Sequence, residues 1–166
     1  MASVKFVIAG KPKGKDVVQG GFTKNRFPDP GTKKEMDLVR LLAVQAMGGR
    51  QPFIGPVEIK VMAWFPIPDS WPKKKKAAAL SGELIPTVKP DFSNILKLVE
   101  DAIHPPPPPK RKKNEHELYY DARHRAWEKI KVIIVDDKQI ADCHGWKRYS
   151  DNPRVVVEVT ELRPEA

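Results

Sequence analysis

The sequence is poor in cysteine and has no long apolar run. Cys143 is the single cysteine among 166 residues, which excludes a disulfide within the chain. The longest apolar stretch lies around residues 131–135, far short of the roughly 20 residues that a membrane-spanning helix needs. The first ten residues lack the basic and then apolar pattern of a signal peptide. These absences predict a cytoplasmic protein that does not bind a membrane.

Acidic residues are also scarce relative to basic ones. The chain has 21 Asp and Glu against 30 Lys and Arg, which gives a formal net charge of +9. Hydrophobic residues make up 40% and charged residues 31% of the chain, a balance typical of a soluble globular protein. We therefore expect one domain over residues 1–166, with a positive charge that suits the phosphate backbone of a nucleic acid.

The spacing of cysteine and histidine does not indicate a metal centre. Cys143 and His144 are neighbours, and neighbouring residues on a strand point to opposite faces of a sheet. His104, His116 and His124 show no metal-ligand spacing. The sequence therefore favours a partly buried Cys143 thiol over a Cys–His pair or a zinc site.

Apolar periodicity predicts strands and helices in a mixed order. The expected strands cover residues 4–8, 57–65, 130–135 and 155–159. A capping-box pattern from Thr32 to Glu35 predicts the start of a helix that ends at Gly48–Gly49. A second helix is expected over residues 91–103, where apolar residues recur at helical spacing. This order favours an α+β fold, a two-layer sandwich of a mixed β-sheet with helices on one face.

The remaining segments are basic or rich in proline. Residues 11–30 are expected to form a basic loop, and residues 71–80 a short basic helix or loop. Residues 104–128 read as an exposed insertion that begins with Pro105–Pro109 and the basic run Lys110–Lys113. Its second half has helical character. The insertion is interpreted as an added DNA contact, a changed dimer edge, a partner-docking module or a tolerated surface loop.

Two acidic stretches stand out on this basic chain. Asp91 begins the second expected helix, and Asp136–Asp137 follow an expected strand, so Asp91 and Asp137 can meet in space. Carboxylates of this kind hold Mg²⁺ for phosphodiester hydrolysis. Lys97, about two turns along the helix, can reach a phosphate as a point charge. Each residue also has an ordinary structural alternative, since Asp91 can cap the helix, the Asp pair can form a turn, and Lys97 can pair with Asp101.

The acidic stretches together resemble the motifs of the RusA family of Holliday-junction resolvases. Lys89–Lys97 is similar to the family's Lys-Pro-Asp-x-Asp-Asn-x-x-Lys motif, and Val135–Ile140 to its Asp-Asp-x-Gln motif. Glu100–Ile103 resembles the end of the family's helix, and Ile8–Lys15 its first strand and basic loop. With the insertion set aside, the resemblance spans almost the whole chain.

This resemblance implies a magnesium-dependent, homodimeric endodeoxyribonuclease that cuts four-way junctions and other branched DNA in recombination and repair, with Mn²⁺ as an alternative ion. The family's acidic cluster maps onto Asp91, Ser93 and Asp137, with Lys97 as its catalytic lysine and Asn94 completing the site. The residues implied in DNA binding are Lys11, Lys13, Lys15, Arg26, Lys89 and Lys147. The family's setting implies a bacterial cell and a phage or prophage origin.

Ser93 departs from the family motif, which has a second carboxylate at this position. A serine hydroxyl brings no negative charge, so the site loses one unit of attraction for a cation. Asp101 lies about 15 Å along the helix from Asp91, which makes Asp136 the better third metal ligand beside Asp91 and Asp137. The lost carboxylate also leaves open a catalytically inactive, branched-DNA-binding protein of the same fold.

Overall fold

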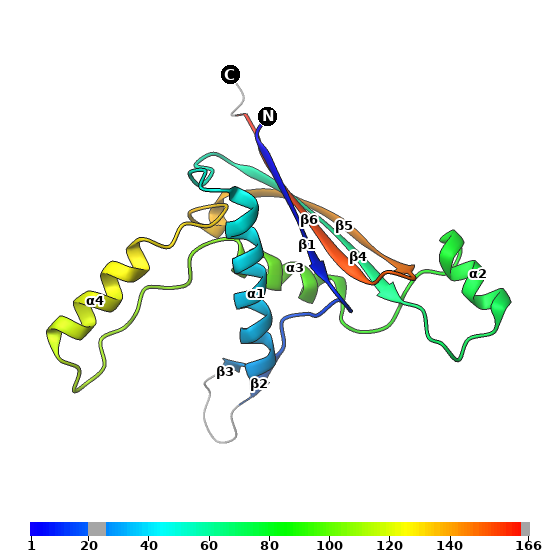
Figure 1. The fold of residues 1–166 in the computed structure, drawn as a ribbon, viewed down its shortest axis with the longest axis horizontal. Helices are drawn as coiled ribbons and strands as arrows, with labels where there is room; N and C mark the ends of the chain where they lie inside the picture. Colours follow the sequence, from blue (N-terminus) through cyan, green and yellow to red (C-terminus); the bar gives the residue numbers. More distant parts are fainter. Residues whose placement is uncertain (20–25, 164–166) are drawn as a thin grey trace.

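In the computed structural model, a four-stranded mixed sheet carries two packed helices on one face (Figure 1). The structure describes residues 1–19 and 26–163. The strand order is β1 (Ser3–Ala9), β6 (Arg154–Glu161), β4 (Val57–Pro66) and β5 (Ile140–Ser150). The β4–β5 pair is parallel, and the β1–β6 and β6–β4 pairs are antiparallel. The expected α+β fold is confirmed.

Four helices and one short 3₁₀ turn complete the described residues. Helices α1 (Pro30–Met47) and α3 (Phe92–Ala102) lie side by side against the sheet (Figure 1). Helix α2 (Lys73–Ser81) contacts β5, whereas α4 (Glu117–Glu128) projects away from the sheet. The 3₁₀ turn η1 (Asp137–Gln139) leads directly into β5. Across residues 1–19 and 26–163, none of the helices has the length and hydropathy to span a bilayer.

The core lies between β4 and the two packed helices. Alternate residues of β4 are almost completely buried: Val57, Ile59, Val61, Ala63 and Phe65. The buried stripe of α3 contributes Ile95, Leu98, Val99 and Ala102. Both elements agree with the predicted periods of two and 3.6 residues, because each has one face in the core and one in solvent.

The predicted strand over residues 130–135 is wrong. Val132, Ile133 and Ile134 are all buried in succession, whereas a strand of a one-sided sheet alternates. Their backbone satisfies its hydrogen bonds irregularly: Ile133 accepts from Phe53 N at 2.8 Å, and the N–H groups of Ile133 and Ile134 donate to the Ile103 carbonyl. The segment is therefore an apolar core loop with a single bridge between Ile134 and Phe53.

Strand β5, which was not predicted from the sequence, occupies one edge of the sheet. It pairs only with β4 among the described strands, in parallel register from Val57 with Ile140 to Pro66 with Ser150. An edge strand with one open face needs few apolar residues. Residues 140–150 form a strand of eleven residues, but their polar composition gives no apolar alternation that would predict it.

The start of α1 also differs from the prediction. Asp29 caps the helix, since its carboxylate accepts a hydrogen bond from Gly31 N at 2.9 Å. Thr32 Oγ1 instead accepts from Asp16 N at 3.0 Å and donates to the Asp16 carbonyl. The capping-box prediction is wrong because Thr32 and Glu35 bind the neighbouring basic loop rather than the helix end.

The expected basic loop over residues 11–30 contains two short strands. β2 (Val17–Gln19) and β3 (Arg26–Pro28) form a separate antiparallel pair. Residues 20–25 lie outside the described residues. The loop up to Asp16 folds back on α1 and α3, where it forms part of the site described below.

The insertion forms an arm, defined here as residues 104–128. Its extended first half runs back along α4 and is bonded to it at two places. Trp127 Nε1 donates to the Pro106 carbonyl at 2.6 Å. Arg123 forms an ion pair with Glu115 at 2.6 Å and donates to the Lys110 carbonyl at 3.2 Å. The predicted helical second half of the insertion is confirmed as α4.

The Arg123–Glu115 pair gives the arm a defined pH dependence. Hydrogen bonds from Arg123 and then from the Lys112 N–H lower the pKa of Glu115 from 4.5 to about 2. A depressed carboxyl pKa stabilises the folded arm at higher pH, and this contribution declines as the pH falls from about 4.5 to about 2. We predict that Glu115→Gln raises amide exchange in α4 by roughly two- to fivefold near neutral pH. Hydrogen-exchange mass spectrometry measures the exchange rate. An unchanged rate in α4 would show that the Arg123–Glu115 ion pair does not stabilise the arm.

Candidate functional site

A cleft of about 490 Å³ opens between the basic loop, the start of α1 and the start of α3. We call it the lysine cleft because three lysines line it, Lys11, Lys13 and Lys89. Asp91 and Asn94, at the start of α3, line it as well. Asp16, Asp29 and Glu35 line the same cleft, and Lys13 is paired with Glu35. Lys11 and Lys89 are therefore the ammonium groups that the cleft offers to a phosphate.

Specific contacts fix the basic loop that forms one wall of the lysine cleft. Lys13 Nζ lies 3.0 Å from the Glu35 carboxylate, whose side chain is only 10% exposed. Lys15 N donates to the Asn94 carbonyl at 2.9 Å, which ties the loop to α3. A Cβ at Gly14 would lie 2.9 Å from both Asn94 Cβ and Pro90 Cβ, so only glycine permits this close approach. The loop is thus a fixed wall of the cleft.

Asp91 occupies the N-cap position of α3, as the sequence predicts. Its backbone is extended, with φ −65° and ψ 148°, yet its carboxylate makes no capping hydrogen bond within the described residues. A carboxylate at this position ordinarily accepts a hydrogen bond from the first turn. The Asp91 carboxylate is exposed at the lysine cleft and is therefore available to a ligand.

Lys147 fixes the segment that carries Asp91. Its Nζ donates to the carbonyls of Val88 and Pro90, at 2.5 and 3.0 Å, and lies 4.7 Å from the centre of the Phe65 ring. These contacts occupy the ammonium group on the protein itself. Lys147 therefore positions the residues before α3, and its predicted contact with DNA stays a prediction.

Asp101 is neutralised by neighbouring cations. Lys15 forms an ion pair with its carboxylate, and Arg40 of α1 donates to its carbonyl at 2.9 Å. Burial lowers the pKa of the Arg40 guanidinium, and the charges of Asp37 and Asp101 partly offset that effect. Asp101 therefore fastens α3 to α1 and the basic loop, and its charge is already paired.

A second face of α3 carries Ser93, Lys97 and Glu100, which follow one another at i, i+4 and i+7. Ser93 and Lys97 are exposed, and Glu100 is half-buried. This face looks toward the start of β5, because the Cys143 thiol lies 3.6 Å from Glu100 Oε1. Burial, followed by the charge of Glu100, raises the pKa of Cys143 to about 11, so the thiol stays protonated and donates to Glu100.

Glu100, Asp137 and Asp142 border one hollow of about 420 Å³, which we call the acidic hollow. Glu100 and Asp137 bring carboxylates to it, whereas the Asp142 carboxylate lies 3.0 Å from His144 Nε2 on the other face of β5. Asp137 and Glu100 are in no ion pair among the described residues. The hollow joins the third turn of α3 to the start of β5. Its oxygen donors are the kind that hard divalent cations prefer.

The turn that presents Asp137 is fixed by Gln139. The Gln139 side chain accepts from the N–H groups of Val135 and Asp136 and donates to the carbonyls of Phe53 and Gly55. Asp136 caps η1, and the hydrogen bond from Lys138 N is the main cause that lowers the pKa of Asp136. Asp136 thus shapes the turn, whereas Asp137 borders the acidic hollow.

The structure groups the predicted site residues around two parts of α3. Asp91 and Asn94 meet Lys11, Lys13 and Lys89 at its N-terminal end. Asp137 lies at the acidic hollow beside Glu100, which is about 13 Å farther along the helix axis than Asp91. Lys97 and Ser93 lie between these ends. Arg26 belongs to β3, where the structure describes only the backbone.

Glu100 and Asp142 border the site but were not predicted from the sequence. The helical period offered a signal for Glu100, since it shares a face with Ser93 and Lys97. No local signal identifies Asp142, because it depends on the unpredicted strand β5. Long-range packing brings Asp142 next to α3.

Removing the ammonium group of Lys147 tests its positioning role. Lys147→Met leaves the carbonyls of Val88 and Pro90 without their donor, which should cost about 1–3 kcal/mol of unfolding free energy. Urea denaturation measures the loss, and hydrogen exchange should quicken in residues 88–92. Lys113→Met, at an exposed position of the arm, is the matched control. Equal stability of the two variants would show that Lys147 does not hold this segment.

Comparison with known proteins identifies a family and one relative of this chain. The family model described as endodeoxyribonuclease RusA matches residues 9–106, which are 98 of the 166 residues. The match contains the basic loop and α3 and ends where the arm begins. The chain is also 29% identical to the uncharacterized protein YqaN of Bacillus subtilis (strain 168), over 98% of this chain and 99% of that protein. The chain belongs to the RusA endodeoxyribonuclease family.

Proposed function

We propose that this protein is a magnesium-dependent endodeoxyribonuclease that cuts four-way junctions and other branched DNA. The observation that carries the proposal concerns the Asp91 carboxylate. Asp91 stands at the N-cap position of α3, but its carboxylate makes no capping hydrogen bond among the described residues, and Asp91 lines the lysine cleft. Family membership supplies the reaction class. The proposed setting is DNA recombination and repair in the bacterial cytoplasm, with a phage or prophage origin.

The donor set fits a hard divalent cation. Glu100 and Asp137 bring two carboxylates to the acidic hollow, and Asp91 places a third at the N-terminal end of α3. Asp137 and Glu100 would hold Mg²⁺ at the acidic hollow, with Asp136 shaping the turn and Glu100 supplying the charge that Ser93 lacks. Asp91 lies about 13 Å farther toward the start of α3 and would act on the substrate at the lysine cleft. Bound Mg²⁺ would polarise the phosphate and lower the pKa of a water molecule. Mn²⁺ accepts the same oxygen ligands.

The remaining residues bind and orient the DNA. Lys11, Lys13 and Lys89 would contact phosphates along the lysine cleft, and Lys15 holds the cleft wall through Asp101. Lys97 is exposed between the two carboxylate groups, where its ammonium group would neutralise charge on the scissile phosphate. Asn94 would orient the strand beside Asp91. A homodimer would place two such sites on the paired strands of a junction.

Cleavage of a synthetic four-way junction tests the function. We expect symmetric nicking with Mg²⁺, none with chelator, and little cutting of linear duplex. Asp91→Asn and Asp137→Asn should each lower the cleavage rate on the order of 100-fold or more and keep junction affinity within a few-fold. Asp69→Asn, an exposed aspartate before α2, is the matched control. Full activity of Asp91→Asn would refute the assignment.

The same assay separates the inactive alternative, which Ser93 favours because the family motif has a carboxylate at this position. Tight junction binding with no cutting in Mg²⁺ or Mn²⁺ would establish a DNA-binding protein. Its affinity would fall with salt but not with chelator, because lysine contacts release counterions and need no metal.

The compensating role of Glu100 has its own test. Glu100→Gln removes one carboxylate from the acidic hollow and should lower the cleavage rate by roughly tenfold or more. Adding Ser93→Asp returns a negative charge to the same face of α3 and should restore part of that rate. Steady-state cleavage at saturating Mg²⁺ measures both variants. Unchanged activity of Glu100→Gln would show that Ser93 is tolerated without Glu100.

A further inference from the structure

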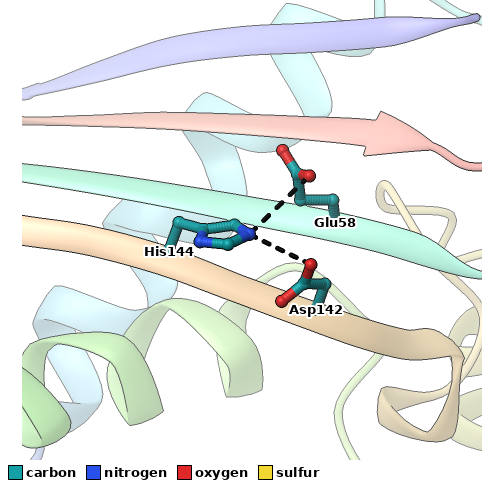
Figure 2. Close-up of side chains that lie close together, drawn as sticks. All are labelled: Glu58, Asp142 and His144. Atoms are coloured by element: carbon teal, nitrogen blue, oxygen red, sulfur yellow. Dashed lines mark hydrogen bonds and ion pairs between the residues drawn. The ribbon is translucent and has the colours of Figure 1, made fainter.

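The sheet face opposite α1 and α3 carries a cluster of three metal-ligating side chains. Glu58 projects from β4, and Asp142 and His144 project from β5 (Figure 2). Their register explains the meeting: Glu58 pairs with Asp142, and Lys60 pairs with His144, so alternate residues of neighbouring strands share this face. Cys143 points to the other face, toward Glu100.

The spacing of the ligand atoms suits one ion. One potential ligand atom from each residue lies within 4.8 Å of those of the other two residues. His144 Nε2 is 3.0 Å from Asp142 Oδ2 and 3.9 Å from Glu58 Oε2. Ligands about 2.1 Å from a metal lie about 3.0 Å apart in octahedral and about 3.4 Å apart in tetrahedral geometry. The His144–Asp142 distance already fits. Rotamer changes that shorten the other separations, which are at most 4.8 Å, by up to about 1.8 Å would let all three atoms bind one ion.

The strands hold these side chains before any ion binds. β4 and β5 form a continuous parallel ladder across this region, and Glu58 is mostly buried, with a side chain 21% exposed. His144 and Asp142 are about half exposed, which leaves open coordination positions for water. Ligands carried on regular strands lose little conformational freedom on binding.

Lys60 is the cation that such an ion would displace. Its Nζ lies 3.1 Å from Glu58 Oε1, and that hydrogen bond raises the pKa of Lys60. The ammonium group therefore neutralises one carboxylate of the cluster. A divalent ion competes with Lys60 for Glu58, so removing Lys60 should strengthen metal binding, whereas it should have no such effect if the cluster is only a network of ion pairs.

We propose that Glu58, Asp142 and His144 form a binding site for a divalent transition-metal ion, distinct from the Mg²⁺ site proposed for catalysis. An imidazole nitrogen with two carboxylates favours Zn²⁺, Mn²⁺ or Co²⁺ over Mg²⁺, which prefers oxygen ligands alone. The ion would join β4 to the edge strand β5. Because Asp142 also borders the acidic hollow, the ion would fix one wall of that hollow.

Zn²⁺ titration of the chelator-treated, untagged protein tests this site by calorimetry. We expect the wild type to bind one equivalent of Zn²⁺ that excess Mg²⁺ does not displace. His144→Gln and Asp142→Asn should each lower the affinity for this Zn²⁺ ion by roughly tenfold or more, since even loss of an outer-shell partner has that effect. Lys60→Met should strengthen it. With Mn²⁺, the imidazole NMR signals of His144 should broaden before those of the other histidines.

Controls separate this site from the proposed catalytic one. His124→Gln removes a histidine that lies 3.4 Å from a carboxylate of Glu128 on α4 and should leave Zn²⁺ binding unchanged. The double variant Asp91→Asn, Asp137→Asn should still bind one equivalent of Zn²⁺, whatever its nuclease activity. The same Zn²⁺ stoichiometry and affinity in wild type and folded His144→Gln would overturn the proposal. Absence of a Mg²⁺-resistant equivalent in the wild type would overturn it as well.

Discussion

The seating of α3 on the sheet is the constraint on which the site depends. The helix approaches β5 so closely that a Cβ at Gly145 would lie 2.4 Å from Phe92 Cζ and 2.1 Å from the Val61 carbonyl oxygen. Its buried stripe, including Leu98 and Val99, packs into the same core as β4. This packing fixes the rotation of α3, and the rotation decides which residues reach the lysine cleft and which reach the acidic hollow. An added side chain at Gly145 would therefore disturb both parts of the site together.

The sequence predicts those elements whose burial alternates in a simple way. β4 and α3 each have one buried face, so their apolar periods are readable and their positions are confirmed. Residues 130–135 mislead because three consecutive apolar residues fill the core from a loop. β5 is missed because an edge strand with an open face carries residues such as His144 and Lys147. Tertiary packing, not local propensity, decides both segments.

The candidate site divides along the same line. Asp91 and its cleft follow from a local motif, and the cleft lysines from a nearby basic loop, so the sequence brings them into view. Glu100, Asp142 and Glu58 enter through contacts between distant parts of the chain. Local reasoning also misassigns Thr32, whose hydroxyl accepts a hydrogen bond from the backbone N–H of Asp16, sixteen residues earlier in the chain.

Net positive charge is a poor measure of the surface that DNA meets. Lys15, Lys147 and Lys60 are bound to Asp101, to backbone carbonyls and to Glu58, respectively. Their charge stabilises the placement of other groups and is only partly available to a phosphate. Lys11 and Lys89 line the cleft without an ion pair among the described residues. Two lysines outside these ion pairs, Lys11 and Lys89, therefore lie at one cleft, beside the start of α3, where the Asp91 carboxylate makes no capping hydrogen bond among the described residues. Available cations beside an available carboxylate agree with the phosphodiesterase function proposed above, whereas a carboxylate that only stabilised the helix would accept a hydrogen bond from its first turn.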